Sequence, residues 1–94
     1  GHNVKIEVEV DTLDQLADVL EEGVDIVMLD NMSNEDMTQA VEMVAGRAVI
    51  EASGGVTLAR IPDIAATGVD LISTGAITHS APNFDVGLDF KSAA

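Results

Sequence analysis

Four short apolar segments recur along the chain at a nearly constant spacing, and this spacing most constrains its fold. They begin near residues 4, 25, 48 and 69, so that 21 to 23 residues separate successive starts. Such a period accommodates one strand, one helix and two short connections. Strands and helices that alternate at this length form a parallel sheet with right-handed crossovers. The sequence therefore predicts an α/β fold of about four β/α units.

The four predicted strands differ in their patterns. Residues 4–10 alternate between an apolar face of valine and isoleucine and a charged face that contains Glu7 and Glu9. Residues 26–29 are uninterruptedly apolar, as expected of a parallel strand covered on both faces. Residues 48–50 and 69–72 complete the set. Residues 23–27 and 68–72 also resemble each other, and each segment joins a helix end to a buried strand.

Three helices are predicted between the strands. Thr12–Gln15 and Ser33–Asp36 are helix-start signatures, and each precedes an apolar stripe of helical period that ends near a glycine. The third helix is expected from about Leu58 to Thr67. Pro62 lies too far into it for a regular first turn, so this helix should start late or be distorted.

The length of the chain limits the architecture. A complete eight-fold β/α barrel needs about 250 residues, and this chain has 94. We expect residues 1–94 to form a single partial β/α barrel, about half of a closed one. A flattened, flavodoxin-like open sheet is the alternative, because periodicity alone does not separate the two.

Composition excludes several classes of function. The chain has no cysteine, tryptophan or tyrosine, which removes disulfides, thiolate metal sites, cysteine nucleophiles and most stacking sites. Seventeen acidic and four basic residues give a net charge of −13, so nucleic acid and anionic membranes are not expected partners. An anionic ligand would need backbone amides, a bridging cation or basic residues from another chain. Without a transmembrane or signal pattern, a cytoplasmic location is expected.

Ligands of parallel α/β proteins gather at the carboxyl ends of the strands. The first two predicted strands end in acids, near Glu9 and at Asp30. The next two end in glycine-containing loops, where backbone amides can approach a phosphate; these loops are Ser53, Gly54 and Gly55, and Thr74, Gly75 and Ala76. The glycines could equally form ordinary turns, Asp30 could cap one, and the strand-one acids could lie on a solvated face.

Five motifs occur in an order and spacing that resemble one family. They are Glu7–Val10, Met28–Met32, Glu51–Gly55, Ala65–Asp70 and Gly75–Ser80, and the resemblance runs from about Asn3 to Phe90. The chain resembles the C-terminal part of quinolinate phosphoribosyltransferase, also called nicotinate-nucleotide pyrophosphorylase. That family converts quinolinate and phosphoribosyl pyrophosphate, with Mg²⁺, into nicotinate mononucleotide, pyrophosphate and CO₂ in NAD biosynthesis.

The resemblance implies roles for individual residues. Glu9 and Asp30 correspond to two catalytic acids near the ribose, and the two glycine-containing loops correspond to phosphate-binding loops. Mg²⁺ accompanies phosphoribosyl pyrophosphate in the full-length family, and none is expected on the isolated chain.

The resemblance also implies that part of the enzyme is missing. The family binds quinolinate through basic residues of an N-terminal domain and of early barrel strands, and this chain lacks those segments. We therefore expect a fragment that is inactive alone. An excised or designed half-barrel module without activity is the alternative. Open sheet edges, near residues 4–10 and 69–72, further predict association with itself, as a homodimer or larger, or with the missing barrel half.

Overall fold

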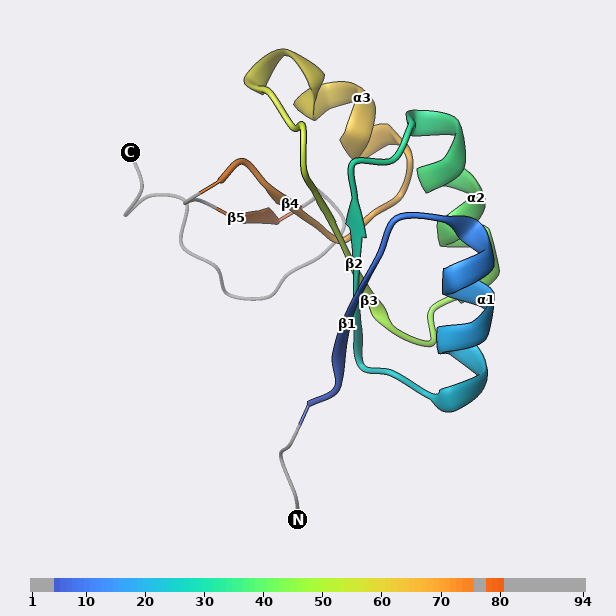
Figure 1. Ribbon diagram of the computed structural model, residues 1–94. Coiled ribbons are helices and arrows are strands. Elements are labelled where there is room, and N and C mark those ends of the chain that lie inside the picture. Colours follow the sequence, from blue (N-terminus) through green and yellow to red (C-terminus); the bar gives the residue numbers. More distant parts are fainter. Residues whose placement is uncertain (1–4, 76–77, 81–94) are drawn as a thin grey trace.

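The computed structural model describes residues 5–75 and 78–80, and these form one sheet with three helices (Figure 1). The strands are β1 (Glu7–Val10), β2 (Ile26–Asp30), β3 (Val49–Ser53), β4 (Leu71–Ser73) and β5 (Thr78–Ser80). The helices are α1 (Leu13–Glu22), α2 (Asn34–Val44) and α3 (Ile61–Ala66), and a single 3₁₀ turn, η1 (Leu58–Arg60), precedes α3.

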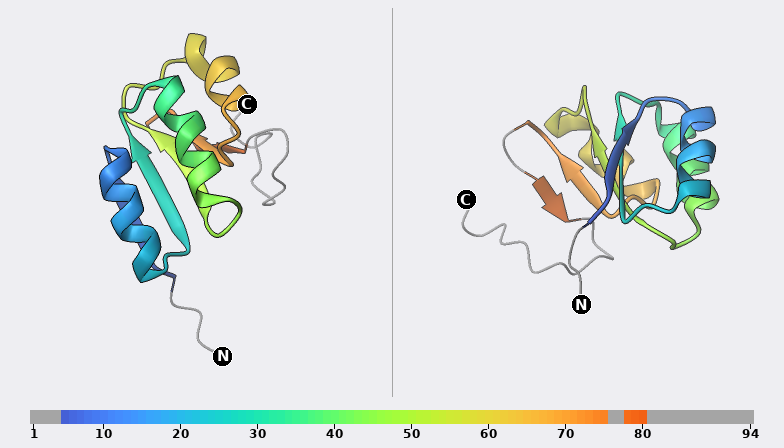
Figure 2. Two further views of the ribbon diagram at one scale, coloured as in Figure 1. Left: turned by 90° about the vertical axis from the view of Figure 1, so that its right-hand side faces the viewer. Right: turned by 60° about the horizontal axis from the view of Figure 1, so that its bottom comes forward.

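The strands lie in the order in which they occur along the chain, and β1 to β4 are parallel. All three helices lie on the same side of the sheet (Figures 1 and 2). Crossovers of one hand that always step in one direction place their helices on one face. A doubly wound flavodoxin-like sheet would instead have helices on both faces. The arrangement is thus an arc of a singly wound β/α sheet, and the described strands do not close into a barrel.

The fifth strand was not predicted. It pairs antiparallel with β4, with Leu71 opposite Ser80 and Ser73 opposite Thr78. The expectation of an open sheet edge at residues 69–72 is therefore wrong, because the chain reverses after β4 and supplies its own neighbour. The outer edge of β1 remains the margin of the sheet at the other side.

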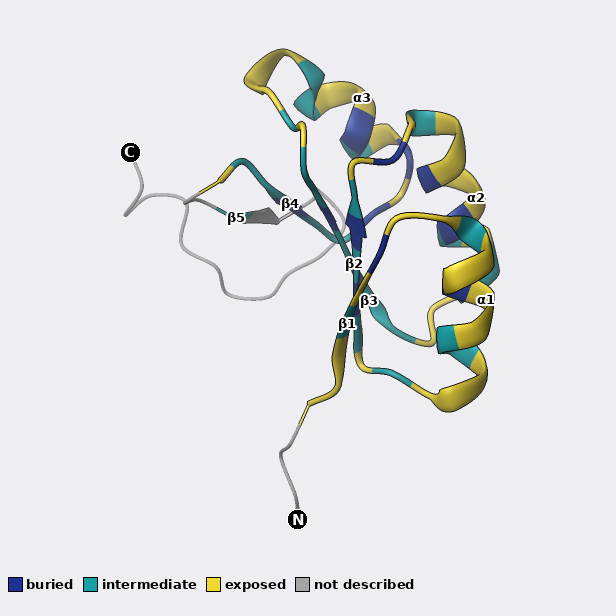
Figure 3. Ribbon diagram, viewed as in Figure 1, coloured by how far each residue is buried: buried dark blue, intermediate teal, exposed yellow. Residues whose placement is uncertain are grey.

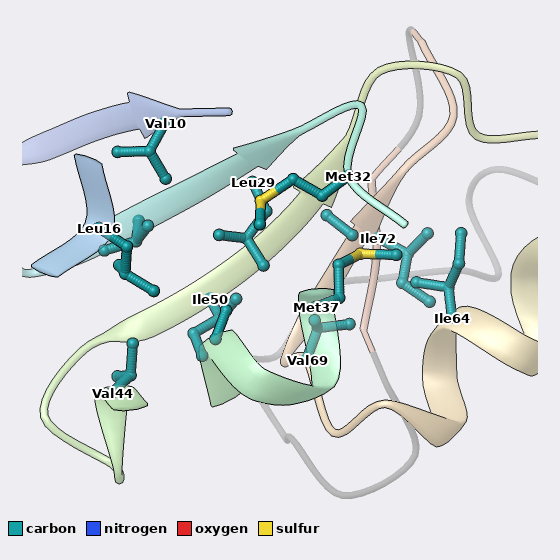
Figure 4. Close-up of a cluster of buried hydrophobic side chains, with 13 residues drawn as sticks. Val10, Leu16, Leu29, Met32, Met37, Val44, Ile50, Ile64, Val69 and Ile72 are labelled. Atoms are coloured by element: carbon teal, nitrogen blue, oxygen red, sulfur yellow. The ribbon is translucent and has the colours of Figure 1, made fainter. Parts of the chain in front are cut away.

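The core lies between the sheet and the helices (Figures 3 and 4). In β2 the buried side chains are Val27 and Leu29, whereas Ile26 and Met28 on the opposite face are only half-buried. The apolar run of β2 therefore has helices over one face alone. The buried hydrophobic residues are Val10, Leu16, Val27, Leu29, Met32, Met37, Ala40, Val44, Ile50, Ala52, Ile64, Val69 and Ile72.

The helix boundaries follow from local side-chain chemistry. Thr12 and Ser33 cap α1 and α2, since the hydroxyl of each accepts a hydrogen bond from a backbone N–H three residues later. Pro62 occupies the first turn of α3, and residues 58–60 form the 3₁₀ turn before it. The late start predicted for the third helix is confirmed.

The repeated segments 23–27 and 68–72 make the same connection in the structure. Asp25 accepts a hydrogen bond from the N–H of Ile6 (2.7 Å) and donates its own N–H to the Ile6 carbonyl (2.9 Å). Asp70 forms the matching pair with Ile50, at 2.8 and 2.9 Å. Each aspartate thus adds hydrogen bonds to the neighbouring strand just before its own strand begins: Asp25 before β2, to the chain entering β1, and Asp70 before β4, to β3.

Candidate functional site at the carboxyl edge of the sheet

The predicted acids and loops lie at one edge of the sheet. Because β1 to β4 are parallel, their carboxyl ends point the same way. Glu9 pairs with Met28, one residue before the strand ends, and Asp30 pairs with Ser53 where β2 and β3 finish. Val8 and Val10 face the helices, so Glu9 and Asp30 both lie on the uncovered face.

A polar groove of about 300 Å³ lies between the ends of β1 and β2. The Gln15 side chain accepts a hydrogen bond from the N–H of Asp11 (2.8 Å) and so holds the β1–α1 turn against the groove. The residues that line this groove are Glu9, Val10, Asp11, Gln15 and Asp30. Its polar lining therefore consists mainly of carboxylate and amide side chains.

The loop after β3 packs directly against the end of β2. Gly54 and Gly55 have φ angles of +71° and +70°, in the left-handed region that favours glycine. A Cβ atom at Gly54 would collide with the Asp30 carboxylate, and one at Gly55 would lie 2.8 Å from the Asn31 side-chain oxygen. Asn31 also donates its N–H to the Ser53 carbonyl (2.8 Å). The two glycines are therefore required by the approach of Asp30 and Asn31, as well as by their backbone angles.

Three consecutive backbone N–H groups of this glycine loop lack a hydrogen-bond partner among the described residues. Within the described part of the chain, the backbone N–H groups of Gly54, Gly55 and Val56 donate to no acceptor. Successive unpaired amides in a turn form the concave sites that bind anions. The helix that follows adds little, because a 3₁₀ turn and only six residues of α3 come next.

The second predicted loop follows β4, the neighbour of β3. Gly75 is exposed with a φ of +93°, and the Ser73 hydroxyl lies 3.4 Å from its carbonyl oxygen. Thr74 is half-buried. Ala76, the third residue predicted for this loop, lies outside the described residues. Thr74 and Gly75 share the sheet edge with the glycine loop.

Glu51 was not among the predicted site residues. It faces the same uncovered side of β3, in register with Met28 and, through it, with Glu9. Partial burial raises the pKa of the Glu51 carboxyl, and the charge of Glu7 raises it further. Its position could have been inferred from strand alternation, but its burial depends on packing across the sheet.

Arg60 was also missed as a site residue. Its guanidinium donates to the Gly55 carbonyl (3.1 Å) and to the side-chain oxygen of Asn34 (2.9 Å), the first residue of α2. Asn34 is 26 residues away in sequence, so no local pattern indicates this contact.

In the described ranges, no group of three or more histidines and carboxylates is placed to hold a metal ion. None of the helices in the described part of the chain is long and apolar enough to cross a membrane.

Comparison with known proteins decides the family. The model of the quinolinate phosphoribosyl transferase C-terminal domain matches residues 1–89. The chain belongs to this family. The resemblance inferred from the five motifs is confirmed.

Relatives of this quinolinate phosphoribosyl transferase C-terminal domain come from bacteria and archaea, among other organisms. A probable carboxylating nicotinate-nucleotide pyrophosphorylase of Bacillus subtilis is 38% identical over 89 residues, which is 95% of this chain and 31% of the relative. One from Archaeoglobus fulgidus is 44% identical over 89% of this chain and 34% of the relative. The solved nicotinate-nucleotide pyrophosphorylase of Francisella tularensis has a TM-score of 0.74 and 47% identity, over 79% of this chain and 26% of that one.

The chain thus spans about a third or less of the proteins it matches. The solved relative has the same α/β architecture with four parallel strands. The prediction of a partial β/α barrel is confirmed as an open sheet of parallel strands with helices on one face. The roles of Glu9, Asp30 and the two loops remain predictions.

Proposed function

We propose that this domain supplies the ribose- and phosphate-binding half of the active site of a carboxylating nicotinate-nucleotide pyrophosphorylase. The complete enzyme would join quinolinate to phosphoribosyl pyrophosphate and release pyrophosphate and CO₂, in NAD biosynthesis. The observation that carries the proposal is the contact between Asp30 and Gly54. It places a carboxylate beside a loop whose amides are available to an anion, as a sugar phosphate requires.

The chemistry assigns different tasks to the acids and the loops. As pyrophosphate leaves, C1 of the ribose develops positive charge, which the carboxylates of Glu9 and Asp30 would stabilise. The amides of Gly54, Gly55 and Val56 would bind a phosphate group, and the Thr74–Gly75 loop a second one. Adjacent loops after the last strands are the common place for phosphate in β/α barrels.

Mg²⁺ fits this site as a companion of the substrate. The groove offers carboxylate oxygens from Glu9, Asp11 and Asp30, which are ligands that Mg²⁺ prefers. Mg²⁺ is usually held by one or two carboxylates, substrate phosphates and waters rather than by a complete protein cage. Bound with phosphoribosyl pyrophosphate, it would neutralise phosphate charge. We accordingly expect no Mg²⁺ on the isolated chain.

Binding of quinolinate would fall to residues outside this chain. Its two carboxylates need basic partners, and the described acids at the carboxyl edge would repel them. We propose that the partner is the remainder of a barrel, or a second copy of this chain, and that the assembly is cytoplasmic. Such a partner would cover the half-buried Ile26 and Met28 on the uncovered face. An excised or designed half-barrel module without activity of its own is the alternative.

An experiment on the isolated chain tests the proposal with two measurements. Titration with inorganic phosphate, followed by ¹H–¹⁵N NMR, should shift the amides of Gly54, Gly55, Val56 and Gly75, with weak affinity in the negative field. Incubation with quinolinate, phosphoribosyl pyrophosphate and Mg²⁺ should release no CO₂, because the quinolinate-binding groups are absent.

The matched control is Gly54→Ala, in which the new Cβ collides with Asp30 and distorts the loop. It should abolish the shifts at residues 54–56. Shifts centred on Gly23 and Gly46 would contradict the phosphate assignment. Release of CO₂ that scales with the pure chain and vanishes in Asp30→Ala would show that the isolated domain is a complete enzyme.

A further inference from the structure

Arg60 links two loops of the candidate site. It lies on the 3₁₀ turn after the glycine loop and is half-buried. One terminal nitrogen of its guanidinium donates to the Gly55 carbonyl at 3.1 Å, and the other donates to Asn34 Oδ1 at 2.9 Å. Asn34 begins α2, so Arg60 ties the loop after β3 to the connection after β2.

Arg60 is also the only basic side chain among the described residues at this edge of the sheet. Lys5 precedes β1, at the opposite end. Arg47 follows α2 and donates to the Met43 and Val44 carbonyls of that helix. Both hydrogen-bond acceptors of Arg60 are neutral oxygens. Neither contact therefore neutralises the charge of Arg60, which is held on the loop whose Gly54 lies against Asp30.

The bond to Gly55 controls the orientation of one peptide unit. Glycine permits many backbone conformations, so the peptides of the Gly54–Gly55 pair can reorient at little cost unless something holds them. Asp30 and Asn31 confine the loop from one direction. Arg60 fixes the Gly55 carbonyl, and in a trans peptide the next N–H points the opposite way. The N–H of Val56 is thereby aimed away from the guanidinium.

We propose that Arg60, held by Asn34, is a positioning residue for the phosphate-binding loop. By holding the Gly55–Val56 peptide, it fixes the Val56 N–H and limits the motion of the Gly54–Gly55 pair before the ligand arrives. Its charge lowers the electrostatic cost of bringing a phosphate group near Asp30. The inference rests on the proposed function. It adds a specific requirement, that the contact between Arg60 and Asn34 be intact for phosphate to bind well.

Two conservative variants separate positioning from charge. Asn34→Ala retains the guanidinium but releases it from α2. Arg60→Lys retains the charge but replaces the planar fork, so that one ammonium cannot reproduce both contacts. Each should weaken binding of inorganic phosphate about fivefold, the effect of one hydrogen bond. The double variant should be little weaker than either single one, because both changes remove the same interaction.

A second measurement needs no ligand. In phosphate-free buffer, the ¹⁵N order parameters of Gly54, Gly55 and Val56 should fall from about 0.85 toward 0.6 in both variants. Arg47→Lys is the matched control, because it changes an arginine at the other end of α2. It should leave phosphate affinity and the order parameters of the loop unchanged.

The outcomes distinguish this inference from the proposed function. If the parent chain shows no phosphate-dependent shifts, the proposed function fails. If the order parameters of the loop stay at the parent values in both Asn34→Ala and Arg60→Lys, the positioning role fails, whatever the parent chain binds. Parent-like phosphate affinity in both variants would also overturn it, because charge alone would then suffice.

Discussion

Glu51 lies in β3, the middle strand of the sheet, and its side chain is half-buried on the face that no helix covers. A negative charge is unfavourable there. Its carboxyl has a raised pKa because burial, and then the charge of Glu7, disfavour ionisation. The folded chain thus binds this proton more tightly than the unfolded chain. The resulting stabilisation is fully present below the ordinary pKa of 4.5 and is lost as the pH rises through the folded-state value.

Glu51→Gln should therefore stabilise the chain at pH 7, by about 0.5 kcal/mol at most, because the side chain is only partly buried and solvent screens its charge. At pH 4 the variant and the parent chain should have nearly equal free energies of unfolding. Urea denaturation of both chains between pH 4 and 8 measures the difference. Glu7→Gln is the control and should show part of the same gain. A gain that is independent of pH would mean that the amide packs better and that charge is not the cause.

Single residues also show where sequence reasoning reached its limit. Asp30 and Gly54 could be assigned to one edge because each follows a predicted strand, and parallel strands end together. Arg60 could not be assigned, because its role depends on Asn34, which only the folded chain brings close. Thr12 and Pro62 act on their own helices, so their effects on helix boundaries were predictable.

At the scale of elements, the connections between helix and strand contain a repeated aspartate. Sequence similarity identified the repeat at Asp25 and Asp70, but not what the carboxylates do. That function depends on the register with the preceding strand, where each accepts a backbone N–H. Strand β5 was missed for a related reason: Thr78–Ser80 has no apolar pattern, and only its pairing with β4 defines it.

The two aspartates should differ in their contribution to stability. Asp70 bonds to the N–H of Ile50 in a partly buried site, whereas Asp25 bonds to that of Ile6 in an exposed one. Asp70→Ala should cost about 1–2 kcal/mol, because a partly buried donor loses its partner, and Asp25→Ala about half of this. Urea denaturation measures both. The Asp→Asn variants retain an acceptor oxygen and should cost less. Equal losses for Asp25→Ala and Asp70→Ala would show that burial does not set the size of the effect.

At the scale of the whole molecule, one face of the sheet and the outer edge of β1 lack a covering element among the described residues. Helices cover one face of the sheet (Figure 1). The other face carries acids such as Glu9 and half-buried apolar side chains such as Met28. The outer edge of β1 is unpaired among the described strands. Ile6 directs its backbone groups toward Asp25, so the alternating backbone of the strand turns those of Glu7 outward. An edge strand with such free groups is a template for pairing with another chain.

We expect the isolated chain to associate through the β1 edge. Its net charge of −13 opposes association, so dimers should strengthen as salt rises from 10 mM to about 0.5 M and screening shortens the Debye length. Glu7→Pro should weaken dimers, because proline removes an outward N–H while leaving the inward pairing with β2 intact. Glu7→Gln removes the same charge but keeps the N–H, and it should dimerise at least as well as the parent. Sedimentation velocity across concentration and salt distinguishes these cases. If Glu7→Pro and Glu7→Gln form dimers of equal strength, the dimer contact lies on the uncovered face of the sheet and not at the β1 edge. If the chain is monomeric under every condition, neither surface requires a partner.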